Sequence, residues 1–282
     1  FVKTDNDAQY DYIKNGEKVR DYGRSNHFIY DEQIKAAYVN LNKQINKKWS
    51  TQLGLRLENT ISKGKQLTTN ENFERNYTQL FPTAFIGYDV NEKNNLSVNY
   101  GRRIERPDYA DLNPFYFFLD KYTYQRGNTN LRPQFSHNIE FSHTYAGNFT
   151  TTLNYTKTTD LINDVLDQNE ETNETFITKS NIANQSQYGV TITTLIPVKK
   201  WLKVNVYGNF SNNRFKGFIN NSNVDLQSNL FTGNVNTQMT FGKGWTGELS
   251  GFYRSKGLEG VLVIGAMGAV NSGISKSILK NK

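Results

Sequence analysis

The feature of this sequence that most constrains its fold is an alternation of apolar and polar residues with a period of two. In residues 51–58, Leu53, Leu55 and Leu57 alternate with polar or small neighbours such as Gln52 and Arg56. The same alternation recurs in three further segments: 96–101, 202–210 and 231–241. A period of two is that of a β-strand with one apolar and one polar face. No comparable stretch shows a helical period, so the sequence predicts an all-β chain.

The breaks between these segments are of two kinds. Short polar breaks of two to four residues recur along the chain at 46–48, 91–94, 146–148, 199–200 and 242–244. The three tryptophans, Trp49, Trp201 and Trp245, directly follow such breaks. Longer polar breaks fall between them, at 68–76, 107–133, 161–174, 217–223 and 256–260. This spacing predicts antiparallel hairpins with short turns at one end of a sheet and long loops at the other.

The alternation and the breaks together predict about twelve strands. Their approximate ranges are 3–12, 33–45, 49–64, 77–90, 95–105, 134–145, 149–160, 176–197, 201–217, 224–241, 245–256 and 262–278. Within 176–197 the polar run from Asn181 to Ser186 is also consistent with a turn that divides the strand in two.

Composition excludes several classes of protein. The chain has no cysteine, which excludes disulfide frameworks and thiol chemistry, and its three histidines are scattered, which argues against a transition-metal site. The net charge of +7 is spread along the sequence, whereas a nucleic-acid-binding protein concentrates its basic residues. No apolar run reaches the about 18 residues of a transmembrane helix, and 261–270 is too short. The mean hydropathy of -0.69 does not exclude membrane-spanning strands, because averaging over alternating apolar and polar residues conceals a strand with one apolar face.

Two motifs carry a resemblance to a known family. One is Arg-Pro-Asp-Tyr-Ala-Asp-Leu-Asn-Pro-Phe at 106–115, and the other is Gly-Asn-Thr-Asn-Leu-Arg-Pro at 127–133. In this order they resemble the barrel of TonB-dependent receptors, and the segments 26–32 and 265–271 strengthen the similarity to the outer membrane protein beta-barrel branch. The resemblance covers nearly the whole chain and does not indicate a ligand.

The resemblance implies a transmembrane antiparallel β-barrel in the Gram-negative bacterial outer membrane, with long outer loops and short periplasmic turns. The barrel of this family has 22 strands, an internal plug and a TonB box. We therefore expect residues 1–282 to form one β-barrel segment of a longer receptor, with the plug and TonB box outside it. The expected partners are membrane lipid, a TonB-type energy-coupling protein acting through the plug, and a surface lipoprotein.

The barrel interpretation fixes which side of each strand faces lipid. It predicts that the apolar set faces lipid: Leu53, Leu55, Leu57, Val98, Val204, Val206, Val235 and Met239. Their polar neighbours should face the lumen: Gln52, Arg56, Asn99, Asn205 and Asn236. The tryptophans should lie at one level on the periplasmic rim, as an interfacial girdle.

The segment 107–133 is the main candidate for ligand binding, because loops of this length are usually functional or disordered and this one is rich in aromatic residues. The candidate aromatic residues are Tyr109, Phe115, Tyr116, Tyr122 and Tyr124. The alternative is that these rings pack the loop against its own barrel.

Arg102, Arg103 and Arg106 precede this loop and are candidates to hold an anionic ligand through bidentate hydrogen bonds. The alternative is that they pair with nearby carboxylates or with carboxylates of the wall: Glu105, Asp108, Asp111, Glu58 or Glu140. The acidic residues within 164–174 suit a hard cation or a solvated surface loop, and their spacing fits no known calcium loop.

The leading functional hypothesis is uptake of a nutrient ligand by a non-enzymatic receptor without a cofactor. The alternatives are a surface adhesin or secretion-associated barrel that binds a partner protein, and a soluble β-sandwich. A hydrolase with paired carboxylates on different strands also remains open, although no nucleophile, zinc or phosphate-binding motif occurs.

Overall fold

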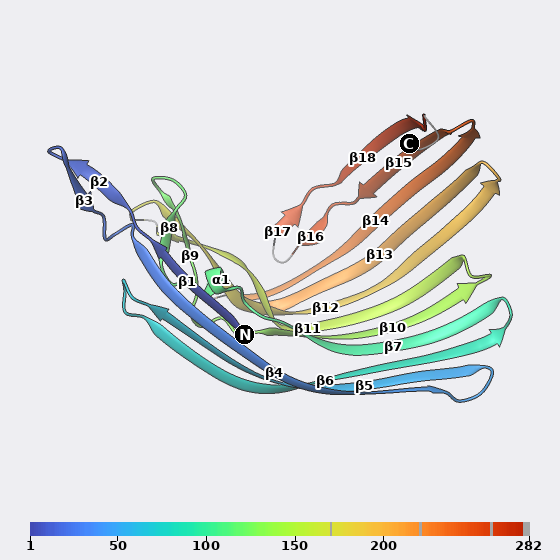
Figure 1. The fold of residues 1–282 in the computed structure, drawn as a ribbon, viewed down its shortest axis with the longest axis horizontal. Coiled ribbons are helices and arrows are strands. Elements are labelled where there is room, and N and C mark those ends of the chain that lie inside the picture. The colour runs from blue at the N-terminus through green and yellow to red at the C-terminus, as the bar shows by residue number, and fades with distance from the viewer. Residues whose placement is uncertain (170, 220–221, 260–261, 279–282) are drawn as a thin grey trace.

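The computed structural model describes residues 1–169, 171–219, 222–259 and 262–278. Twelve strands form one curved antiparallel sheet in the order β1-β4-β5-β6-β7-β10-β11-β12-β13-β14-β15-β18 (Figure 1). The bounds are β1 Val2–Ala8, β4 Asn26–Gln44, β5 Trp49–Gln66, β6 Asn72–Asn91, β7 Asn94–Glu105, β10 Gln134–Tyr145, β11 Phe149–Asn169, β12 Glu174–Lys199, β13 Leu202–Ile219, β14 Ser222–Gly242, β15 Trp245–Arg254 and β18 Met267–Lys276. The prediction of an antiparallel sheet of about twelve strands is confirmed.

Register confirms the division of the strands into two faces. Leu53 lies opposite Ala84, Val98 lies opposite Ile86, and Val206 lies opposite Val235. Because directly opposite residues point to the same side of a sheet, the register extends the apolar face from strand to strand. One row crosses seven strands: Ile86, Val98, Phe141, Leu153, Val190, Phe210 and Phe231. The predicted lipid-facing and lumen-facing sets therefore occupy opposite faces.

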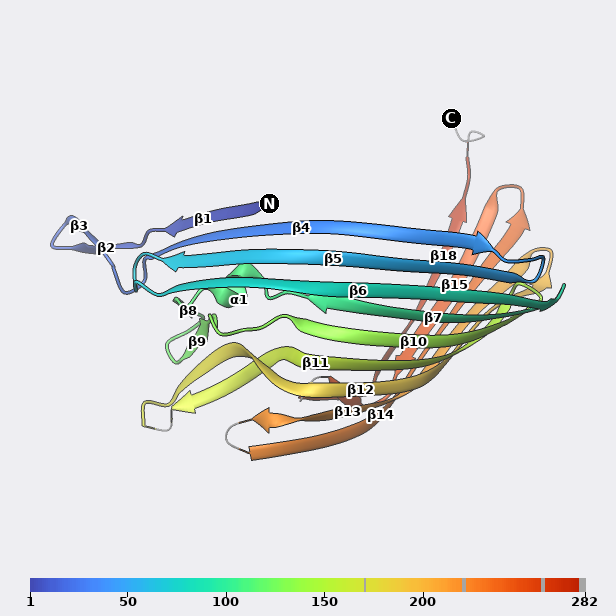
Figure 2. The same ribbon diagram turned by 90° about the horizontal axis from the view of Figure 1, so that it is seen from below.

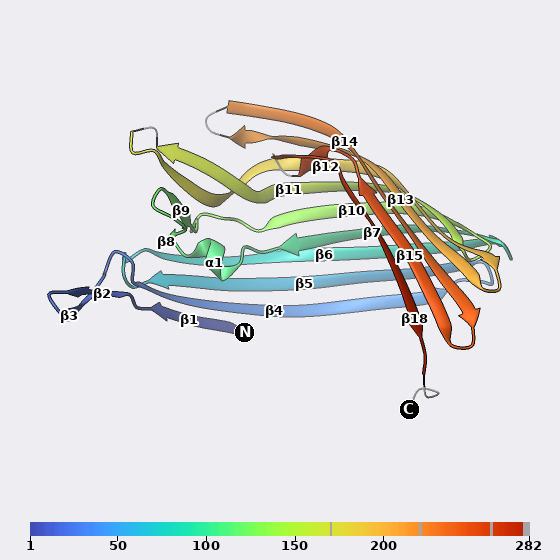
Figure 3. The same ribbon diagram turned by 90° about the horizontal axis from the view of Figure 1, so that it is seen from above.

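The sheet is curved, and the segment between β7 and β10 lies on its concave side (Figures 1 and 3). That segment contains α1 (Tyr109–Leu112), β8 (Tyr116–Phe118) and β9 (Thr123–Arg126). It covers polar residues of β5, so that Glu58, Thr60, Ser62 and Gln66 are buried. The concave face is thus the polar one, and the apolar row lies on the convex face.

The short turns lie together at one end of the sheet, as the sequence predicted (Figures 1 and 2). Trp49 and Trp245 begin β5 and β15, and Trp201 immediately precedes β13. All three side chains are exposed. The tryptophans therefore share a place beside the same set of turns.

The prediction of long loops at the other end is wrong for most hairpins. The range 68–76 shrinks to 67–71 between β5 and β6, and 161–174 is mostly strand, because β11 and β12 remain paired as far as Asn169 and Glu174. The strands continue well past the roughly 9–11 residues that cross a membrane, so the outer end is built from paired strand extensions. Of the predicted long loops, 107–133 keeps its full length between β7 and β10.

Two strand predictions need correction at the N-terminus. The predicted strand 3–12 ends at Ala8, and the chain then forms the separate hairpin of β2 (Asp11–Lys14) and β3 (Glu17–Arg20). The Asn15-Gly16 turn between them has positive φ at both residues, which matches the right-handed twist of a two-residue hairpin. The strand predicted at 33–45 already begins at Asn26, where it pairs with β1 and then with β5.

Strand β12 is continuous, so no turn divides it at 181–186. Its ladder with β11 instead contains a bulge, where Asp160 adopts a φ of 55° and the register shifts. The Asn181 side chain donates to the backbone oxygens of Asp160 and Arg132, at 2.7 and 2.8 Å. The polar run therefore lies within a continuous strand, beside the bulge, and does not form a turn.

Near the C-terminus, the predicted strand 262–278 is two strands. β17 (Leu262–Ile264) pairs with β16 (Gly257–Glu259), and β18 begins after Gly265-Ala266. Residues 279–282 lie outside the described residues, as does Glu170 of the acidic segment.

Within the described residues β1 and β18 are the two edges of the strand order, and no ladder joins them. The first and last strands of this order therefore do not close on each other in the described part of the chain.

Candidate functional site

The two sequence motifs of the 107–133 segment meet and form one folded unit. The Gly127 amide donates to the Asn113 oxygen at 2.9 Å, and the Asn128 amide donates to the Asp111 oxygen at 2.6 Å. A Cβ on Gly127 would clash with the Asn113 backbone, so this position requires glycine. The two motifs thus occur together for a structural reason, because backbone amides of the second motif donate to backbone oxygens of the first.

This unit is fixed to the sheet by an apolar core. Leu112 and Leu131, one from each motif, are buried against Phe28 and Tyr30 of β4. Both leucines are almost completely inaccessible, at 1% and 0% exposure. The motif leucines therefore pack the loop against its own wall, which is the structural alternative that the sequence left open.

A buried polar contact adds to this attachment. The Gln66 side-chain amide of β5 donates to the Asn26 side-chain oxygen at 2.5 Å and to that of Asn113 at 3.2 Å. Asn113 Oδ1 also accepts the Phe115 amide at 3.2 Å. Hydrogen bonds of this kind are required because an unpaired buried amide is costly.

Arg106 belongs to the attachment and not to an open ligand site. Its guanidinium donates to the Glu58 carboxylate and to Thr60 Oγ1, and Glu32 lies 4.0 Å from its Nε. The Glu58 side chain is only 6% exposed and the Arg106 side chain 20%. This ion pair supports pairing with wall carboxylates, with Glu58 as the partner.

Arg102 and Arg103 point to different surroundings. Arg102 donates to the Leu80 oxygen at 2.7 Å and to Gln79 Oε1 at 2.8 Å, next to the outermost β6–β7 pair of Thr83 and Gly101. Arg103 is exposed and has no hydrogen bond or ion pair within the described part of the chain. The structure thus separates Arg106 from Arg102 and Arg103, which both line a cavity on the wall.

The aromatic residues of the β8–β9 hairpin line a cavity of about 600 Å³ at the outer end of the sheet. Of the predicted site residues, Phe115, Tyr116 and Tyr124 line this cavity, whereas Tyr109 and Tyr122 are exposed outside it. Phe117 and Phe118 complete the aromatic wall.

The opposite wall of the cavity comes from the segment between β1 and β4. Tyr10 and Arg24 line it, and the Arg24 guanidinium lies 5.2 Å from the centre of the Phe118 ring. These residues are about a hundred positions from the hairpin in sequence, so no local pattern indicated them. An isolated tyrosine and an arginine beside a turn give no signal before the fold brings them together.

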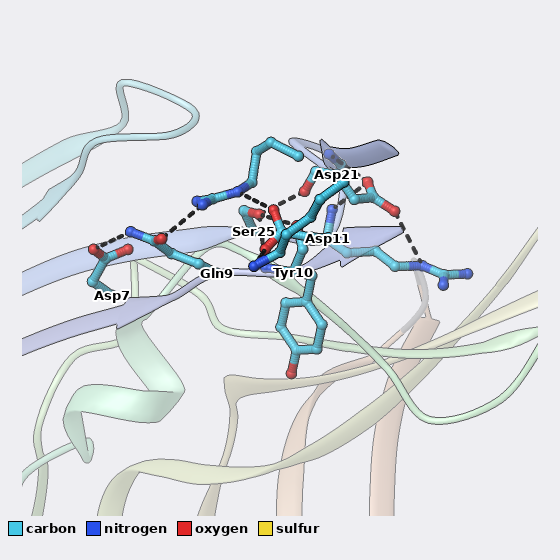
Figure 4. Close-up of polar contacts among 10 residues, drawn as sticks. Asp7, Gln9, Tyr10, Asp11, Asp21 and Ser25 are labelled. Carbon is cyan, nitrogen blue, oxygen red and sulfur yellow. Dashed lines mark hydrogen bonds and ion pairs between the residues drawn. The ribbon is translucent and has the colours of Figure 1, made fainter. Parts of the chain in front are cut away.

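A network of polar contacts holds this second wall in place (Figure 4). The Tyr10 amide donates to Ser25 Oγ at 3.1 Å, and Ser25 Oγ donates to the Asp21 oxygen at 2.6 Å. Arg20 joins Asp11 across the β2–β3 hairpin at 2.6 Å. The Tyr10 ring points away from this network (Figure 4).

The β8–β9 hairpin is attached to the outer extension of β12. Three residues of β9 pair in parallel with β12, and the Tyr124 ring stacks on Phe176 at 5.5 Å. The Tyr124 hydroxyl donates to the Glu174 carboxylate at 3.1 Å. Partial desolvation and this carboxylate raise the pKa of Tyr124, so the phenol remains a hydrogen-bond donor at neutral pH.

Chemically, the cavity offers aromatic faces and cationic groups. Arg24 and Lys121 contribute positive charge. The Asp120 carboxylate already accepts the Tyr122 and Thr123 amides at 2.7 and 2.8 Å, contacts that lower the pKa of Asp120. Such a cavity suits a ligand with a flat or apolar body and a polar or anionic edge.

The fold defines the class of protein. A long antiparallel sheet with an apolar convex face, a polar concave face and exposed aromatic residues beside the short turns is the wall of an outer-membrane β-barrel. The chain belongs to the Outer membrane protein beta-barrel family, whose profile matches residues 1–282. The family places the chain in the Gram-negative outer membrane, among non-enzymatic proteins. No curated protein sequence matches it.

Solved structures with the same fold are receptors and transporters of the outer membrane. The copper transporter OprC is 11% identical, with a TM-score of 0.67 over 99% of this chain and 45% of its own. The ferric yersiniabactin uptake receptor FyuA from Yersinia pestis is 16% identical, with a TM-score of 0.62 over 95% of this chain and 41% of its own. The siderophore receptor PiuA from Acinetobacter baumannii is 12% identical, with a TM-score of 0.61 over 94% of this chain and 38% of its own. These identities support the fold alone, and the chain spans less than half of each structure.

The structure rejects the soluble β-sandwich, because the twelve strands form a single curved sheet that matches barrel walls. No helix among the described residues is long and apolar enough to cross a membrane.

Proposed function

We propose that the chain is part of a TonB-dependent receptor that takes up a nutrient ligand across the outer membrane. The observation that carries the proposal is the aromatic cavity at the outer end of the wall, formed by the β8–β9 hairpin and the segment before β4. In this proposal the ligand first binds there, between Tyr10 and Arg24 on one side and Phe118 and Tyr124 on the other.

The position of the hairpin supports this assignment. The hairpin lies on the concave side, at the end opposite the short turns (Figures 1 and 2). The motif unit beneath it is held by buried leucines and by Gln66, so the cavity stands on a rigid base. A rigid base holds the binding groups in place and reduces the entropy cost of binding a ligand.

Transport would further require a TonB-type protein that acts through a plug, and a surface lipoprotein is an additional proposed partner. Both partners are inferred from the resemblance to TonB-dependent receptors and not from contacts of the described residues. The alternative function, binding of a partner protein by a surface adhesin or secretion-associated barrel, draws on the same exposed hairpin.

The experiment compares cells that make the full-length receptor with cells that lack it. Small molecules removed from a defined medium are measured by mass spectrometry, with and without a protonophore. Nutrient uptake predicts at least one compound that disappears only with the receptor and only in energised cells. Partner binding without transport predicts no such compound, and that outcome would reject uptake.

The cavity itself is tested in the same cells with Phe118→Ala. Loss of an aromatic wall should weaken uptake at limiting ligand by roughly tenfold. The matched control is Tyr122→Ala, which removes an exposed aromatic residue of the same hairpin that does not line the cavity. Equal uptake by both variants would place the ligand elsewhere.

A further inference from the structure

A second cavity, of about 550 Å³, lies on the wall below the point where Arg106 meets Glu58. Tyr38, Gly54, Thr83 and Arg103 contribute to its lining. Register puts Tyr38 opposite Arg56, and Gly54 opposite Thr83, on the polar concave face. Most of the lining therefore belongs to the lumen side, whereas Leu55, Arg102 and Ile104 occupy register positions of the convex face. The cavity shares no lining residue with the aromatic cavity of the β8–β9 hairpin.

The floor of this cavity exists because residue 54 is glycine. A Cβ at Gly54 would collide with the side-chain oxygens of Thr83 and Asn40. Thr83 and Asn40 both line the hollow together with Gly54. The wall here thus presents a polar depression instead of a packed side chain.

The charge of the lining is one-sided. Three arginines, Arg56, Arg102 and Arg103, and no carboxylate line the cavity. Arg56 pairs at 3.0 Å with Glu58, which lies outside the lining and also pairs with Arg106.

The other two arginines keep their positive charge. Arg102 donates to neutral acceptors, the Leu80 oxygen and Gln79 Oε1, and its guanidinium lies 5.5 Å from the centre of the Phe81 ring. Arg103 is exposed and makes no ion pair within the described residues. The cavity therefore carries about two positive charges that no wall carboxylate offsets.

We propose that this cavity is an oxyanion-binding site, in which Arg103 binds a phosphate or carboxylate group and Arg102 adds positive charge. The planar guanidinium offers paired donors that match the two oxygens of such a group. The Tyr38 and Thr83 hydroxyls are neutral donors in the same lining. The cavity volume lies within the range of small-ligand sites. This site does not depend on the proposed uptake, because binding of an anion requires no transport.

The test measures binding of inorganic phosphate to the purified full-length receptor by isothermal titration calorimetry at constant ionic strength. Arg103→Gln should weaken binding about tenfold or more, because it removes a charged hydrogen-bond donor. The matched control is Lys203→Gln, which removes an exposed cation of the same face beside a short turn, outside the cavity. Its affinity should equal that of the wild type.

A second variant separates the cavity from general charge. Gly54→Ala keeps every arginine and fills the floor, so it should also weaken phosphate binding. Acetate, titrated in parallel, distinguishes a site for carboxylates from one for phosphate alone. Heat-dependent migration of each variant in electrophoresis reports whether its barrel is folded. Absence of phosphate and acetate binding in the wild type would overturn the proposal, as would equal affinities in Arg103→Gln and Lys203→Gln.

Discussion

The ion pair of Arg106 with Glu58 is one of the buried contacts that attach the 107–133 segment to the wall, and Arg106→Met tests its contribution. Glu58 is 5% exposed and would lose its main partner, while Arg56 at 3.0 Å would remain. Removing one partner of a buried pair costs about 3–5 kcal/mol. Because Arg56 keeps part of the compensation, we expect the low end, about 3 kcal/mol, or roughly a hundredfold more opening of the loop.

Hydrogen exchange in the full-length receptor measures this opening. The amides of Gly127 and Asn128 report on it, because their bonds to Asn113 and Asp111 join the two motifs. Their exchange should accelerate roughly a hundredfold in Arg106→Met. The amides of the β13–β14 ladder, on the far side of the sheet, should be unaffected.

Two control variants test whether burial of the ion pair is the reason for the faster exchange. Arg214→Met breaks an exposed pair with Asp225, whose side chains are 44% and 48% exposed, and should change local exchange by less than about fivefold. The double variant Arg106→Met with Glu58→Met removes both buried charges and should recover much of the loss. Unchanged exchange at Gly127 and Asn128 in the single variant would refute the assignment of Arg106 as an anchor.

Three further predictions concern the wall. Leu55→Arg places a charge on the convex apolar face and should cost about 2–4 kcal/mol of folding free energy in lipid bilayers, measured by denaturant titration; a neutral result would contradict lipid exposure. The three tryptophans should be quenched by brominated lipids at one shallow depth, and three different depths would contradict an interfacial girdle. Arg214 lowers the pKa of the Asp225 carboxyl to about 2, below its ordinary value of 3.8, so the pair stabilises the outer β13–β14 hairpin above pH 4 and loses this effect as the pH falls through about 2. Hydrogen exchange of that hairpin against pH measures the loss, and a transition near pH 4 or above would contradict the paired geometry.

The sequence alone determined the faces and the turn end of the sheet. Side-chain direction alternates strictly along a strand, so Leu53 and Val98 share the apolar face in any register that keeps the core pattern. The tryptophans beside short polar breaks could likewise be assigned to one end, because hairpin turns are local in sequence. The strand count followed from these two local signals.

Strand ends and irregularities were less predictable, because pairing overrides local composition. The polar segments at 161–169 and 181–186 resemble loops, yet each becomes strand since pairing with its neighbour continues on both sides of a bulge. The Asn15-Gly16 turn was a local hairpin signal, but the flanking residues alternate too weakly to reveal it. Only the tertiary pairing decided these boundaries.

The candidate site shows most clearly which features the local sequence indicates and which depend on the tertiary structure. The sequence placed Arg102, Arg103 and Arg106 together, whereas the structure keeps Arg102 and Arg103 beside one wall cavity and gives Arg106 to a buried pair with Glu58. It also brought Tyr10 and Arg24 to the aromatic hairpin. Contacts between residues far apart in the chain depend on how the loop folds back onto the sheet, and no local pattern encodes that geometry.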